Sequence, residues 1–168
     1  MDDTIRDDYD MLLHLAEEVK LPHEELVAKA KVLFPNFTNT PIYDDVLGSY
    51  EIEVYQTSRA MGLSVEDAAY SAEVSKTVMQ HALSGEGLSV SKFVALIKAE
   101  LFASAELVIR MLRIIEKADN NTEVNAAIAL LEKIAPEKYG KAAGLKPITP
   151  GSGKGVVLNF SLYEEDEE

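Results

Sequence analysis

The hydrophobic residues near the start of the chain recur at intervals of three and four, which is the spacing of one face of an α-helix. This pattern predicts a helix from Asp3 to Lys20. A second short helix is expected next, with Pro22 in its first turn and an end at Phe34-Pro35. Residues 35–41 hold two prolines and two asparagines and are predicted to form a loop. We therefore expect a helical extension over residues 1–48.

Residues 49–87 predict three compact helices separated by tight turns. Gly62 is expected to end the first helix as a C-terminal cap, and Ser64 and Ser75 are good N-caps for the second and third. A short helix, a tight turn and a capped helix in this order are typical of a helix-turn-helix domain. The expected helices are Tyr50–Met61, a segment from Ser64 to about Ala72, and Lys76–Leu83, which stops at the turn Gly85-Glu86-Gly87.

The longest predicted helix runs from Val90 to about Ala118. Its apolar residues form a seam that steps three or four residues at a time, and further apolar residues lie outside that seam. An interior helix of one globule is one interpretation. A chain of 168 residues offers few other elements to cover so much apolar surface, so we favour a subunit interface. The residues expected to contact a neighbouring subunit are Val94, Ile97, Leu101, Val108, Leu112 and Ile115.

The remaining chain predicts a helix that folds back on the long one, followed by a linker and a strand. Asp119-Asn120-Asn121 is expected to reverse the chain, which gives a helical hairpin over residues 88–140. Residues 141–168 hold the linker, a strand over residues 156–162 and an acidic tail. The predicted fold is therefore mainly α, with a helix-turn-helix domain, a hairpin for oligomerisation and one short C-terminal β-strand.

Composition narrows the possible functions. The chain contains no cysteine, which excludes disulfides, thiolate zinc sites and a cysteine nucleophile. The three histidines are scattered, and no nucleophile and base are convincingly placed together, so we expect no enzyme, no metal and no cofactor. No apolar run is long enough to span a bilayer, and the first residues lack a signal-peptide pattern. A cytoplasmic protein without a membrane partner is the expectation.

The formal net charge is -13, and its distribution matters more than its total. Only residues 88–146 lean basic, with nine basic and seven acidic side chains. Arg110 and Arg113 in this block lie away from the main seam and can face solvent, a neighbour or nucleic acid. The loop at residues 150–155 contains Gly-Ser-Gly-Lys-Gly, but its order and the strand after it do not fit a phosphate-binding loop, so a linker is predicted.

The helix-turn-helix pattern gives the candidate DNA contacts. The exposed face of the third short helix is the part that such domains place in a groove of DNA. A three-helix unit without any ligand is the alternative, because this block is net acidic. The candidate DNA-binding residues are Arg59, Ser75, Lys76, Thr77, Gln80 and His81.

Two stretches of the sequence resemble one family. Residues 61–83 are similar to the "G-L-S-x-E-D-A-A-x-x-A-G-V-S-x" segment of the small terminase subunits of tailed bacteriophages, although Glu73 stands where that turn often has glycine and Ala82 where an aromatic residue often closes the recognition helix. Residues 125–140 resemble their "A-A-x-x-L-L-E-x-x-x-P-E-x-Y-G" ending. The order of elements over residues 49–168 agrees as well.

This resemblance implies a homo-oligomeric ring that recognises double-stranded viral DNA in the cytoplasm of the bacterial host. It also implies that the ring recruits and regulates the large terminase subunit, the ATPase and nuclease that packages the genome. The residues that would reach the large subunit are Val156, Val157, Leu158, Phe160 and Leu162.

Two other classes of protein stay open on the sequence. One is a dimeric helix-turn-helix transcriptional regulator that binds a palindromic operator. The other is a structural interaction protein that never contacts DNA, which the acidic first 48 residues keep open.

Overall fold

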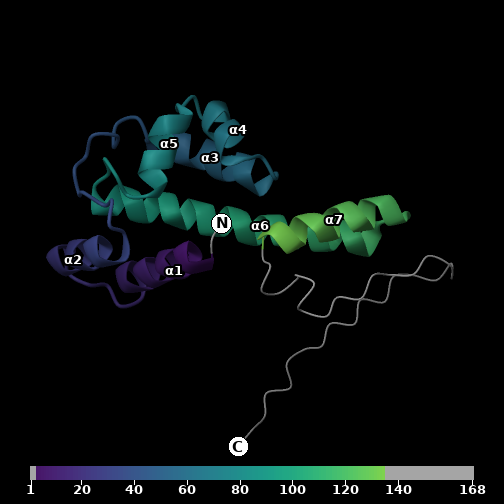
Figure 1. Ribbon diagram of the computed structural model, residues 1–168, viewed down its shortest axis with the longest axis horizontal. Coiled ribbons are helices and arrows are strands. Elements are labelled where there is room, and N and C mark those ends of the chain that lie inside the picture. The colour runs from purple at the N-terminus through teal and green to yellow at the C-terminus, as the bar shows by residue number, and fades with distance from the viewer. Residues whose placement is uncertain (1–2, 135–168) are drawn as a thin grey trace, which may run out of the picture. The chain divides into compact units, whose positions relative to one another are not determined.

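The computed structural model describes residues 3–134, and this part of the chain is helical without any strand, so the mainly α prediction is confirmed (Figure 1). The predicted strand, its five candidate contacts with the large subunit, and the end of the predicted hairpin lie outside the described residues. The contacts divide the chain after Ile109 into two compact units. The helices are α1 (Asp3–Glu17), α2 (His23–Leu33), α3 (Ser49–Ala60), α4 (Val65–Ser71), α5 (Lys76–Leu83), α6 (Val90–Lys117) and α7 (Asn121–Ile134).

The first unit has one core, to which the N-terminal helices and the middle helices both contribute. Tyr9 of α1, Phe34 after α2 and Phe93 of α6 pack together, with the Phe34 and Phe93 ring centroids 4.9 Å apart and nearly perpendicular. Within this unit, α1 and α2 lie on one side of α6, and α3, α4 and α5 lie on the other (Figure 1). The boundary expected at residue 48 therefore falls inside a unit, because the two segments bury their apolar faces on the same helix.

The loop after α2 holds the beginning of α6. The Val90 amide donates to the Asn39 side-chain oxygen at 3.1 Å, and the Ser89 amide donates to the Asp44 carboxylate at 2.9 Å. The Thr38 hydroxyl oxygen accepts from the Gly87 amide at 3.2 Å. The first amides of a helix have no partner within the helix, so Asn39 of this loop supplies an acceptor to the first amide of α6, and the Ser89 hydroxyl oxygen accepts from the Lys92 amide at 3.3 Å.

The ends of the short helices follow the predicted capping residues. Gly62 has φ +92° after α3, and the Ser64 and Ser75 side chains accept from backbone amides in the first turns of α4 and α5. These three cap predictions are confirmed. Pro22 differs, because it precedes α2 as the N-cap, and its carbonyl accepts from the Leu26 amide.

The described part of the second unit, residues 110–134, consists of the last turns of α6 and of α7. Asn120 caps α7, since its side-chain oxygen accepts from the Glu123 amide at 3.0 Å. The buried apolar residues of this unit come from both helices: Met111, Ile115, Val124, Ala127 and Leu131.

A pair of neighbouring residues on α1 tests whether the N-terminal helices belong to the core. Leu12 is fully buried, whereas Met11 is 51% exposed. We expect Leu12→Ala to lower the free energy of unfolding by about 3 kcal/mol, from lost burial and the cavity left behind. Met11→Ala is the matched control and should change it by less than about 0.5 kcal/mol. Urea unfolding measures both, and equal effects would show that α1 is only an appendage.

Candidate functional site

The α4-turn-α5 segment brings two short helices into close contact. Ala68, Ala69 and Ala72 are buried, and Val74 anchors the turn with its amide donating to the Ala69 carbonyl at 2.9 Å. Glu73 adopts φ +58°, the left-handed conformation that glycine adopts most easily. The chain therefore makes the tight turn at this position without the glycine.

The side chains expected to face DNA do not all lie on the free surface of α5. Lys76, Thr77 and Gln80 are exposed. The Ser75 hydroxyl oxygen accepts from the Val78 amide at 3.2 Å and so serves as the helix cap. His81 is half-buried, and its Nδ1 is buried without a hydrogen-bond partner among the described residues. The structure thus presents three of the six candidates on one exposed helix.

The surface of α4 and α5 is acidic. The Lys76 ammonium pairs with Glu66 of α4 at 2.6 Å, and Asp67 and Glu73 are exposed nearby in sequence. Tyr70, which the sequence reasoning did not select, is 85% exposed on α4. Its position directly after the buried pair Ala68 and Ala69 does not by itself distinguish it from a core residue.

The structure corrects the prediction that Arg59 faces DNA. It points into the first unit, where its Nη2 lies 2.6 Å from Oε1 of Glu100 on α6 and its Nε lies 3.1 Å from the same oxygen. Its Nη1 donates to the Leu63 carbonyl at 2.7 Å. Glu100 is 2% exposed, and a buried carboxylate requires a paired and hydrogen-bonded cation. Arg59 is therefore occupied in the core and unavailable to DNA.

The buried pair changes the titration of its neighbours. Burial lowers the pKa of Arg59, but the hydrogen bond to Glu100 and its charge outweigh that effect and raise the pKa above its usual value. Burial, and then the negative charge of Glu100, also raise the pKa of Tyr9 and Tyr55 far above their usual value of about 10. All three groups keep their protons in the folded chain at neutral pH.

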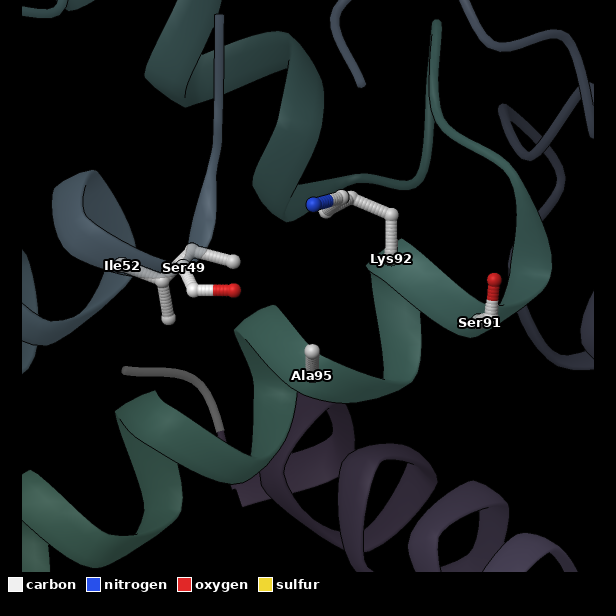
Figure 2. Close-up of a pocket in the computed structure, with 5 residues that line it drawn as sticks. All are labelled: Ser49, Ile52, Ser91, Lys92 and Ala95. Atoms are coloured by element: carbon white, nitrogen blue, oxygen red, sulfur yellow. The ribbon is translucent and has the colours of Figure 1, made fainter. Parts of the chain in front are cut away.

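A small hollow lies between the start of α3 and the first turns of α6. Figure 2 shows Ser49 and Ile52 on one side, Ser91, Lys92 and Ala95 on the other, and the Lys92 ammonium above the space between them. One cation and two hydroxyls suit a small polar group. They place no pair of groups for acid, base or nucleophilic chemistry.

The exposed apolar residues of α6 differ from the predicted seam. Ile97 and Ile115 are fully buried within the chain, so the expectation that they face a neighbouring subunit is wrong. Of the other seam residues, Val94 and Leu101 pack against the core of the first unit, while Val108 and Leu112 are half-buried. In the first unit, the large apolar side chains that α6 leaves exposed are Phe102 (52% exposed) and Ile109 (50% exposed), and Ala105 is exposed between them.

Comparison of the chain with protein-family models, curated proteins and solved structures found no match. Over residues 3–134, no helix is both long and apolar enough to cross a membrane. The described residues also bring no three histidine, aspartate or glutamate side chains together in an arrangement that could hold a metal ion.

Removal of the Glu100 carboxylate tests the buried pair. Glu100→Ala leaves the Arg59 guanidinium half-enclosed without its counter-charge, and we expect a loss of about 3 kcal/mol in the free energy of unfolding. Glu106→Ala on the exposed side of the same helix is the control, with an expected change below about 0.5 kcal/mol. A double variant, Arg59→Met with Glu100→Leu, should recover much of the loss in urea unfolding. If Glu100→Ala and Glu106→Ala lowered the free energy of unfolding equally, the assignment of Glu100 to a buried ion pair would be contradicted.

The raised tyrosine pKa values predict a dependence of stability on alkaline pH. Above pH 10 the unfolded chain loses the phenolic protons of Tyr9 and Tyr55 while the folded chain keeps them. The unfolded state then binds fewer protons, so the free energy of unfolding falls as pH rises, by up to about 1.4 kcal/mol per pH unit for each tyrosine. Urea unfolding from pH 9 to 11 measures the slope. Tyr9→Phe with Tyr55→Phe should flatten it, and an unchanged slope would contradict the prediction.

Proposed function

We propose that this chain is a small terminase subunit, a ring-forming factor that recognises viral double-stranded DNA and recruits and regulates the large terminase ATPase and nuclease. The observation that carries the proposal is the α4-turn-α5 geometry. Two helices capped by Ser64 and Ser75 meet at a left-handed Glu73, in the part of the chain that resembles the family's helix-turn-helix. The long α6 follows directly after it, as the family pattern requires.

In this proposal, α5 is the recognition helix. Lys76, Thr77 and Gln80 offer a cation, a hydroxyl and an amide, which are groups that contact DNA phosphates and base edges. The Lys76 pair with Glu66 is half-exposed on both sides. Exposed ion pairs contribute only about 0 to 1 kcal/mol, so Lys76 can exchange its carboxylate for a phosphate.

The exposed apolar face of α6 is the proposed subunit interface. Phe102, Ala105 and Ile109 are spaced three and four residues apart, which places them on one side of the helix. Two large apolar side chains about half exposed are unfavourable in water and become favourable when a second copy covers them. This face replaces the buried seam residues as the assembly surface.

Assembly also supports DNA binding by a chain that has few cations near its recognition helix. One copy presents few free cations beside its recognition helix, but a ring repeats that helix many times on one DNA molecule. The α6–α7 hairpin and the contacts of residues 156–162 with the large subunit remain parts of the proposal. No catalytic step is assigned to this chain.

The proposal is tested by native mass spectrometry together with a DNA-binding measurement. Phe102→Asp with Ile109→Asp should dissociate the oligomer and lower the affinity for double-stranded DNA by about tenfold or more, because avidity is lost. Val32→Asp with Met11→Asp adds the same charge at exposed apolar positions of α2 and α1 and should leave assembly intact.

A closed ring in the unaltered protein supports the proposal. A dimer would favour the transcriptional regulator instead. A double aspartate variant that keeps the full DNA affinity as a monomer would contradict the link between assembly and binding.

A further inference from the structure

Three cations lie on one face at the end of α6. Arg110, Arg113 and Lys117 are spaced by three and four residues, and together with Ile114, Ala118 and Glu123 they line a surface hollow in the second unit. All three are exposed. Glu123 is the one carboxylate in the lining, so the hollow carries a net positive charge.

These cations differ from several others in the chain, because no ion pair joins them to any described residue. Arg59 is held by Glu100, Lys76 by Glu66 and Lys98 by Glu17. Other described lysines, Lys29, Lys31 and Lys92 among them, are also unpaired, but Arg110, Arg113 and Lys117 lie together on one face at the end of α6, in a chain whose net charge is -13.

We infer that Arg110, Arg113 and Lys117 form a binding site for the phosphate backbone of double-stranded DNA. The inference rests on the proposed function, because it takes DNA as the ligand, and it places the main electrostatic contact outside α5. The α4 and α5 surface carries Glu66, Asp67 and Glu73 against the single cation Lys76. Backbone contacts supply most of the sequence-independent affinity for DNA, so they need cations that are free.

The geometry of the cluster suits a duplex. Arg110 and Lys117 are separated by about 10 Å along the helix axis, and a duplex of that length carries about six phosphate charges. The two guanidinium groups can each hold a phosphate through two parallel hydrogen bonds, and the ammonium can contact a third as a point charge. Such contacts position a protein on DNA without reading sequence, which leaves α5 to contact the bases.

The test also distinguishes two other roles of these three cations. Cations near the C-terminus of a helix stabilise that helix through its dipole, which affects the melting temperature and not the DNA affinity. An acidic peptide is the other candidate, and the chain itself ends in Glu164-Glu165-Asp166-Glu167-Glu168.

The test compares two triple variants of the full chain that lose the same charge. Arg110→Gln, Arg113→Gln and Lys117→Gln remove the cluster, and Lys29→Gln, Lys31→Gln and Lys92→Gln remove three cations elsewhere. Binding to labelled double-stranded DNA is followed by fluorescence anisotropy between about 50 and 200 mM salt. Native mass spectrometry and thermal unfolding accompany each variant.

We expect the variant that lacks the three α6 cations, the cluster variant, to bind DNA about tenfold or more weakly at low salt. The slope of log K against log salt should decrease in magnitude by about one for each phosphate contact removed. The control variant should stay within about threefold of the unaltered protein, and both should assemble as it does. Equal losses in the two variants would overturn the inference, since net charge alone would then explain them.

Further measurements distinguish failure of this inference from failure of the proposed function. If Thr77→Ala with Gln80→Ala abolishes DNA binding while the cluster variant binds normally, the inference fails and the proposed function stands. If the unaltered ring binds no DNA, both fail. If the cluster variant keeps its DNA affinity but no longer binds a synthetic peptide of residues 156–168, the cluster holds the acidic tail and the inference is overturned.

Discussion

The buried carboxylate of Glu100 needs a counter-charge, and this requirement ties α3 to α6 in the first unit. At 2% exposure it has lost nearly all contact with water, and Arg59 offers it three nitrogen-to-oxygen contacts between 2.6 and 3.3 Å. A rotation or slide of α3 would leave two opposite charges buried and unpaired, which is far more costly than a change in apolar packing. Burial, and then the charge of Glu100, raise the pKa of Tyr9 and Tyr55 in the same core.

The first half of α6 therefore packs against other helices of the first unit on both of its sides. The aromatic rings of Tyr9, Phe34 and Phe93 hold α1 and α2 against it, and the loop that carries Asn39 and Asp44 supplies acceptors for its first amides. Of the short helices, α3 is tied to α6 by the Arg59–Glu100 pair, α4 packs against α3, and α5 packs against α4. A protein that presents α5 to a ligand thus depends on its N-terminal residues, even though they resemble no part of the family pattern.

Local chemistry made much of this fold predictable. Ser64, Ser75 and Gly62 cap helices through interactions with residues three to five positions away, so the sequence alone locates those helix ends. The partner of Arg59 lies 41 residues away, and nothing near Arg59 indicates it. A signal did exist on α6, where Glu100 occupies a position of the buried apolar face at helical spacing from Phe93, Leu96, Ala103 and Leu107. The seam prediction failed at Ile97 and Ile115 because periodicity shows that a face is apolar but not whether the chain itself covers it.

Sequestration of Arg59 also bears on the proposed DNA contacts. With that guanidinium in the core and Lys76 beside Glu66, α5 retains neutral donors and acceptors that suit the reading of bases more than the neutralisation of phosphates. Unpaired cations are found instead on the last turns of α6. A ring would repeat both features in every subunit. In the proposed function, α6 would supply attraction and α5 selectivity, and this division would allow a strongly acidic protein to bind an acidic polymer.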